Sequence, residues 1–173
     1  MTTLRPFECG DLFRFNNINL DPLTETYNIP FYMTYISTWP SLCATYEDSN
    51  GRLMGYILGK AEGHDELWHG HVTAVTVSSE FRRLGVAKNL MAYLEDASER
   101  QYNAYFVDLF VRVSNKLAQL MYRNLGYIVF RQVLGYYSRE EDAYDMRRRL
   151  PRDKLGKSVV PLKHPITPDQ LEW

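Results

Sequence analysis

The stretch from residue 71 to residue 90 constrains the fold of this chain more than any other. It begins with the apolar, β-branched run His71–Val77, which is typical of a strand, and turns at Ser78–Phe81. It then continues with one apolar face at helical spacing. The connection reads Arg82-Arg83-Leu84-Gly85-Val86-Ala87 and matches the pattern Gln/Arg-x-x-Gly-x-Gly/Ala. The stretch therefore predicts a strand that leads through a tight turn into a helix.

Such a turn is suited to holding an anion. The first N–H groups of a helix have no intrahelical partner, and the helix adds its positive dipole end. Small residues at Gly85 and Ala87 let an anion approach these donors, and a diphosphate suits the nest best. The pattern is neither G-x-G-x-x-G nor a P-loop, so a dinucleotide fold and a P-loop are both excluded. A tight strand-to-helix turn without a ligand is the alternative.

Composition narrows the class of protein. The 173 residues suffice for one domain, alone or with a tail. With 20 basic and 21 acidic residues the net charge is −1, so we expect no direct binding to nucleic acid or to an anionic membrane. The two cysteines make neither a disulfide framework nor a metal set. No apolar run approaches the length of a membrane span, and we expect a cytoplasmic protein.

The rest of the chain predicts a mixture of strands and helices. Asn50-Gly51 between apolar runs predicts a hairpin. We expect strands at residues 2–6, 42–46, 53–61, 71–77, 104–111, 127–133 and 143–149, and helices at 9–19, 31–39, 85–101 and 115–125. This order predicts one α/β (mixed α+β) domain over residues 1–150, a mixed central sheet with helices on both faces. Residues 151–173 form a Pro-containing tail, either disordered or laid along a surface.

A second motif makes a family resemblance visible. The run Asn115-Lys-Leu-Ala-Gln-Leu-Met-Tyr122-Arg-Asn-Leu-Gly-Tyr127 follows the loop at the appropriate distance. Together the two motifs resemble the GCN5-related N-acetyltransferase (GNAT) superfamily. The resemblance implies that the loop binds the pyrophosphate of acetyl-CoA and that the backbone of Val75 and Val77 holds its amides. It also places Asn115 and Tyr122 beside the thioester.

Longer segments resemble one group within that superfamily, the NatB type of N-terminal acetyltransferase. They are residues 11–27, 68–74, 107–115 and 142–146 and, more loosely, 161–165. The resemblance implies transfer of acetyl to the α-amino group of nascent chains that begin Met-Asp, Met-Glu, Met-Asn or Met-Gln. It further implies a large helical-repeat auxiliary subunit and association with ribosomes through it.

The chemistry of acetyl transfer favours a proton donor over a strong base. An α-amino group with a pKa of about 7.7–8.0 is already partly neutral near pH 7. The departing coenzyme A thiolate gains from a donor, and Tyr122 is the candidate. Alternatively, Tyr122 is a core aromatic whose hydroxyl has another partner. Asn115 caps its helix, contacts the cofactor, or does both.

Substrate recognition requires a group that accepts four different second residues. Asp, Glu, Asn and Gln share a side-chain oxygen, so the site needs a donor, and His71 is useful in either protonation state. A purely structural His71 is the alternative, and Glu25 is otherwise a solvated loop acid. We expect Leu23 and Phe31 to line the pocket for Met. The candidate substrate-binding residues are Glu25, Tyr27, His71, Thr73 and the tandem tyrosines Tyr136 and Tyr137.

Two further questions stay open in the sequence. His64, His69 and His71 lie close together, but no carboxylate or cysteine is seen to complete a set, so we expect no metal. His64 and His69 are expected to be solvated. A lysine or small-amine acetyltransferase and a non-catalytic acyl-CoA-binding subunit are the competing functions.

Overall fold

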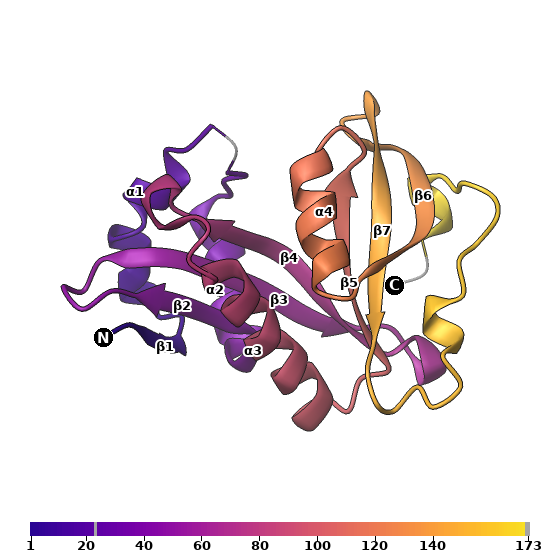
Figure 1. The fold of residues 1–173 in the computed structure, drawn as a ribbon, viewed down its shortest axis with the longest axis horizontal. Helices are drawn as coiled ribbons and strands as arrows, with labels where there is room; N and C mark the ends of the chain where they lie inside the picture. The colour runs from indigo at the N-terminus through magenta and orange to yellow at the C-terminus, as the bar shows by residue number, and fades with distance from the viewer. Residues whose placement is uncertain (23, 172–173) are drawn as a thin grey trace. The chain divides into compact units, whose positions relative to one another are not determined.

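A computed structural model describes residues 1–22 and 24–171 of the chain. The strands within this range form one mixed sheet in the order β1-β2-β3-β4-β5-β7-β6 (Figure 1). They are β1 (Thr3–Pro6), β2 (Cys43–Glu47), β3 (Leu53–Glu62), β4 (His69–Val77), β5 (Phe106–Arg112), β6 (Ile128–Tyr137) and β7 (Glu141–Arg149). The α-helices are α1 (Asn16–Asn19), α2 (Ile29–Thr38), α3 (Val86–Arg100) and α4 (Lys116–Asn124). The predicted α+β class is confirmed.

The chain divides into two compact units, which we describe separately. The first contains residues 1–60 and 72–97, and the second contains residues 61–71 and 98–173. Because the division passes through β4, residues 69–71 of this strand belong to the second unit. In the part of the chain that the structure describes, no helix is both long and apolar enough to cross a membrane.

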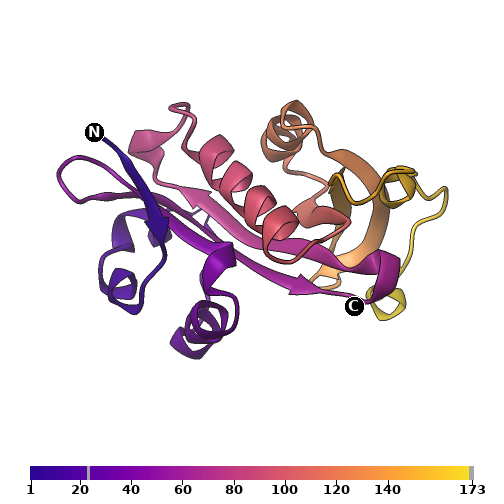
Figure 2. The same ribbon diagram turned by 90° about the horizontal axis from the view of Figure 1, so that it is seen from below.

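The first unit is built on an antiparallel β1-β2-β3 meander. The predicted hairpin at Asn50-Gly51 is confirmed, with Gly51 at a φ of 78°. Figure 2 shows α3 on one face of this part of the sheet and α1 and α2 on the other. Under α1 and α2 lies an aromatic cluster in which Phe15 contacts Tyr32 and Tyr56 at ring distances of 5.3 and 5.7 Å. This part of the sheet is thus covered on both faces.

The helix expected at residues 9–19 is wrong as a continuous element. A 3-10 helix at Cys9–Phe13 is followed by the four-residue α1. The reason lies in Asp11, which is 2% exposed and accepts two hydrogen bonds of 2.8 Å from Arg5. A buried carboxylate paired with a strand residue holds the first turn against β1, so the helical spacing of the apolar residues does not decide the backbone.

The second unit contains β5, β7 and β6, with β7 between the other two and antiparallel to both. Of the roles expected for Asn115, the cap of α4 is confirmed: its Oδ1 accepts from the Ala118 N–H at 3.1 Å. Gly126 follows the helix at a φ of 91°. The described part of the tail runs along β6, where Leu162 donates to the Phe130 carbonyl at 2.7 Å. That residue 150 marks the domain boundary stays a prediction.

Candidate active site

The loop before α3 has the backbone of an anion nest. Arg83 and Gly85 adopt left-handed φ values of 65° and 79°. Within residues 1–22 and 24–171, no backbone N–H from Arg82 to Lys88 donates to a backbone carbonyl. A Cβ built on Gly85 would meet nothing within 4 Å, so the space above the loop is open. The Arg82 guanidinium lies 2.7 Å from the Asp21 carboxylate. Leu84 is 65% exposed and Val86 is buried. The loop is therefore anchored at Val86, and its N–H groups have no backbone partner among the described residues.

The other candidates of the first unit differ in how firmly they are held. Thr73 lies on β4 and donates to the Tyr35 hydroxyl at 2.8 Å. Tyr27 stacks on Phe31 with ring centroids 4.2 Å apart. Thr73 and Tyr27 are therefore both held by contacts with aromatic residues of α2. The remaining candidates are Glu25, which is exposed, Val75, Val77 and Ala87, which are half-buried, and Leu23, which lies outside the described residues.

Tyr122 on α4 is buried in the second unit, with 8% of its surface exposed. Its ring lies 6.0 Å from that of Tyr127. Among the described residues, none forms a hydrogen bond with its hydroxyl. Burial raises the pKa of Tyr122 to about 12, so the phenol stays protonated at neutral pH. A core tyrosine would have needed a partner, and Tyr122 instead offers a protonated, unengaged hydroxyl.

Asn115 shows that capping and ligand binding do not exclude one another. Its Oδ1 is used by the Ala118 N–H, while its Nδ2 has no hydrogen-bond partner in the described part of the chain. The residue is exposed. An amide with one end fixed and one donor available is well placed to contact a ligand.

The tandem tyrosines lie at the end of β6, beyond the strand expected at residues 127–133, and both are half-buried. Tyr136 stacks on Phe110 at 4.5 Å, and Phe110 in turn lies 5.6 Å from the His71 ring. Tyr137 donates to the Phe110 carbonyl at 3.3 Å, and the Arg112 guanidinium lies 4.0 Å from the centre of its ring. A row of aromatic contacts therefore connects the tyrosine pair with His71.

His71 is held by a partner that the sequence reasoning missed. Its Nδ1 lies 2.7 Å from Oδ1 of Asp108 on β5, and both residues are buried. Burial disfavours the Asp108 carboxylate, but His69, His71 and Arg147 outweigh it and hold the pKa of Asp108 below its usual range. An ionised carboxylate only accepts, so Nδ1 carries the hydrogen. The signal in the sequence was a single acid within an otherwise apolar strand.

His69 was expected to be solvated, and this is wrong: only 5% of its surface is exposed. Its Nδ1 donates to the Leu67 carbonyl at 2.6 Å, and its Nε2 lies 3.5 Å from Asp108 and 3.7 Å from Glu62. Burial lowers the pKa of His69, but Asp108 and Glu62 more than compensate and leave it raised. His64 is exposed. The second histidine is thus part of a buried charge network.

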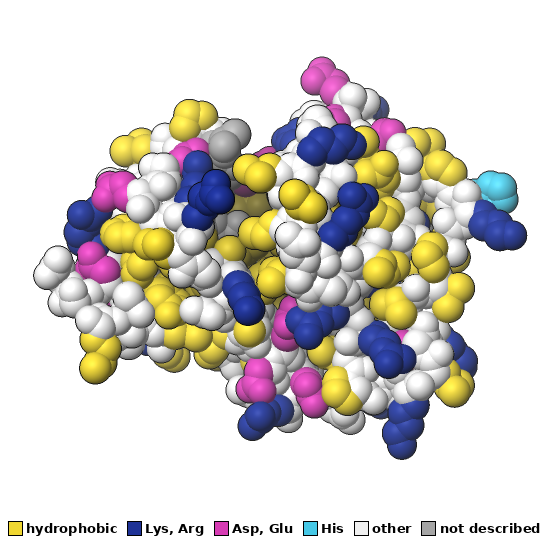
Figure 3. Space-filling model, viewed as in Figure 1, with side chains coloured by type: hydrophobic (Ala, Val, Ile, Leu, Met, Phe, Trp, Pro, Cys, Tyr) yellow, Lys and Arg dark blue, Asp and Glu magenta, His cyan; other side chains and the backbone are white. Residues whose placement is uncertain are grey.

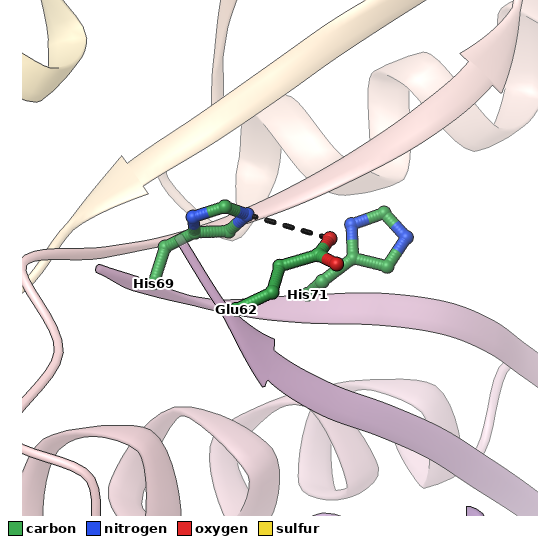
Figure 4. Close-up of side chains that lie close together, drawn as sticks. All are labelled: Glu62, His69 and His71. Carbon is green, nitrogen blue, oxygen red and sulfur yellow. Dashed lines mark ion pairs between the residues drawn. The ribbon is translucent and has the colours of Figure 1, made fainter. Parts of the chain in front are cut away.

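Glu62 is a carboxylate close to these histidines that the sequence analysis missed. Ligand atoms of Glu62, His69 and His71 lie within 4.8 Å of one another (Figure 4). Two ligands of a tetrahedral zinc ion lie about 3.3 Å apart, because each bond is about 2.0–2.1 Å long. The 2.7 Å between His71 and Asp108 is a hydrogen-bond distance and leaves no room for an ion between them. The cluster as it stands does not fit a metal, and the expectation that the protein uses none stays a prediction.

The fold and these residues define a class of protein. Residues 12–127 match the acetyltransferase (GNAT) family. The chain belongs to this family, and within it to the catalytic subunits of the N-terminal acetyltransferase B complex.

The relatives carry the narrower assignment. The chain is 62% identical over 172 residues to N-alpha-acetyltransferase 20 of Dictyostelium discoideum, covering 99% of both chains. It is 60% identical to the N-terminal acetyltransferase B complex catalytic subunit NAA20 of Arabidopsis thaliana, covering 100% of this chain and 99% of the relative. Chaetomium thermophilum Naa20 in complex with a bisubstrate analogue superimposes with a TM-score of 0.90 at 40% identity, covering 96% of this chain and 97% of the other.

Proposed function

We propose that this enzyme transfers acetyl from acetyl-CoA to the α-amino group of protein N-termini beginning Met-Asp, Met-Glu, Met-Asn or Met-Gln. The observation that carries the proposal is the protonated hydroxyl of the buried residue Tyr122, with which none of the described residues forms a hydrogen bond. A hydroxyl in this state serves as a proton donor to a developing anion. The relatives named for N-terminal acetylation support the same reaction.

The reaction needs little else from the protein. The neutral amine attacks the thioester carbonyl, the carbon–sulfur bond breaks, and the thiolate takes the proton of Tyr122. The proton lost by the amine passes to water, which returns one to the tyrosinate. Because a useful fraction of an α-amino group is neutral near pH 7, no strong base is required. Nδ2 of Asn115 is a donor for the cofactor.

The loop at residues 82–87 is proposed to hold the pyrophosphate. Its N–H groups without a backbone partner among the described residues, and the start of the 15-residue α3, favour a dianionic group. Exposed basic residues also lie on the second unit, where Figure 3 shows Lys and Arg side chains over α4 and β7. They include Lys116, Arg123, Arg148 and Arg149. A basic surface favours the approach of an anionic co-substrate. The backbone of Val75 and Val77 is assigned to the amides of coenzyme A.

Replacement of Gly85 by Val should weaken coenzyme A binding about tenfold or more. The new side chain occupies the open space above the loop and strains a backbone with positive φ, so hydrogen bonds to a charged group are lost. Calorimetric titration of the folded variant with coenzyme A measures the effect. Gly51→Val is the matched control, because Gly51 has a φ of 78° but lies in the β2–β3 hairpin. Equal affinities in wild type and Gly85→Val would place the pyrophosphate elsewhere.

The proposal extends to the assembly. Solved structures of the NatB acetyltransferase complex, one bound to a bisubstrate inhibitor, contain chains that superimpose on this one with TM-scores of 0.88 and 0.80. We infer that this chain likewise works with an auxiliary subunit, a large helical-repeat protein that brings it to ribosomes in the cytoplasm.

A peptide panel tests the function as a whole. Peptides that differ only at residue 2 are assayed for acetylation by the full chain, with and without the auxiliary subunit. We expect Met-Asp, Met-Glu, Met-Asn and Met-Gln to be acetylated and Met-Ala and Met-Lys to be poor substrates. Preferential acetylation of internal lysine would favour the side-chain acetyltransferase, and binding of coenzyme A without turnover would favour the non-catalytic subunit.

A further inference from the structure

The hydrogen bond between His71 and Asp108 limits what His71 can present to a ligand. Because Nδ1 donates to Asp108 at 2.7 Å, only Nε2 is available. Nε2 points away from Glu62 and His69 (Figure 4), and none of the described residues forms a hydrogen bond with it. In a neutral ring this nitrogen is an acceptor, and in the imidazolium it is a donor. The protonation state of His71 therefore decides which partner it accepts.

The two states differ in the second residues that they recognise. An Asn or Gln side chain carries both a donor and an acceptor, so it can pair with Nε2 in either state by turning its amide. An ionised Asp or Glu side chain only accepts, so it pairs with the imidazolium and is repelled by the lone pair of the neutral ring. On this reasoning the histidine recognises an amide side chain in either protonation state and an acid only as the imidazolium.

Charged groups on the neighbouring strands surround His71. Asp108 on β5 is in direct contact, and Glu62 on β3 lies within 4.8 Å. Nε2 of His69 on β4 lies 3.7 Å from the Glu62 carboxylate and 3.5 Å from the Asp108 carboxylate. On β7, the charge of Arg147 helps to lower the pKa of Asp108, and the Arg147 guanidinium lies 3.2 Å from the Asp145 carboxylate. The carboxylate nearest to His71 is therefore an ionised one, at hydrogen-bond distance.

We propose that Asp108 is a positioning residue for substrate recognition: its hydrogen bond turns His71 so that Nε2 faces the second residue of the peptide, and its negative charge strengthens the pairing of the His71 ring with Asp and Glu. This inference rests on the proposed function. It gives Asp108 a role in specificity without any contact to substrate.

The test compares specificity constants for Met-Asp and Met-Asn peptides between about pH 6 and pH 9, using the full chain in complex with its auxiliary subunit. The pKa of the amine is measured for each peptide, because the Asp carboxylate raises that of Met-Asp, and its titration is divided out of the ratio. In the wild type the Met-Asp over Met-Asn ratio should fall as the pH rises. In Asp108→Asn, which keeps an acceptor but loses the charge, the ratio near pH 7 should fall about tenfold, because charge-assisted hydrogen bonds are roughly twice as strong as neutral ones.

Each result is decisive. A wild-type ratio that stays flat over the pH range overturns the inference, and this measurement does not depend on the variant folding. Equal losses on both peptides in a folded Asp108→Asn variant also overturn it, since Asp108 would then be structural. In either case acetylation of both peptides by the wild type leaves the proposed function intact. If the wild type acetylates neither, the proposed function fails.

Discussion

Tyr122→Phe lowers turnover by about 10- to 10³-fold in the result that we expect, with a smaller change in affinity for acetyl-CoA. The substitution removes one hydroxyl from a residue that is already buried. That hydroxyl has no hydrogen-bond partner in the described range, so its removal strands no protein group and should leave folding intact. Turnover is measured with a saturating Met-Asp peptide under single-turnover conditions, where chemistry limits the rate.

Tyr127→Phe is the matched control for this experiment. Tyr127 is 2% exposed, and its ring lies 6.0 Å from that of Tyr122. If loss of a buried hydroxyl in this region acted through packing, both variants would slow the reaction alike. Wild-type turnover in Tyr122→Phe would show that Tyr122 is not the proton donor and would favour the alternative, a core aromatic residue.

The second large effect is expected for His71→Ala. A hydrogen bond to a charged group contributes about 1.5–3 kcal/mol, so the specificity constant for Met-Asp should fall by roughly 10- to 150-fold. A Met-Ala peptide offers no side-chain acceptor and should lose little. The measurement is the ratio of the specificity constants for Met-Asp and Met-Ala, which should collapse toward one in the variant.

His64→Ala controls for the loss of a histidine, because His64 is exposed and lies outside the buried network. Removal of His71 also strands the Asp108 carboxylate, so the stability of the variant is measured by thermal unfolding in parallel. An equal fall in activity on Met-Asp and Met-Ala would make His71 structural or catalytic and not a reader of the second residue.

Local signals in the sequence predicted local structure well. The Asn-Gly hairpin and the cap by Asn115 each depend on a few adjacent residues, and each is confirmed. The helix at residues 9–19 failed because Arg5 on another element binds Asp11. The strand order could not be predicted either, since periodicity shows which face of a strand is buried but not which strand lies beside it.

The same limit explains what was missed in the candidate site. Glu62, His71 and Asp108 come from three different strands, and their proximity exists only once the order β3-β4-β5 is known. From the sequence alone, His71 therefore lacked the partner that fixes its ring, and His69 lacked the two carboxylates that make its burial possible. The loop and the Asn115–Tyr127 run needed no such information, because each is contained in one continuous segment.

The tail along β6 bears on the tendency of the protein to aggregate. A sheet whose outermost strand shows a free row of N–H and C=O groups invites pairing with another chain and, eventually, aggregation. Here the outer strand β6 exchanges hydrogen bonds with Leu162 and Ile166, while the opposite outer strand is only four residues long and ends in Pro6. Loss of the last dozen residues would therefore threaten solubility before it threatened catalysis.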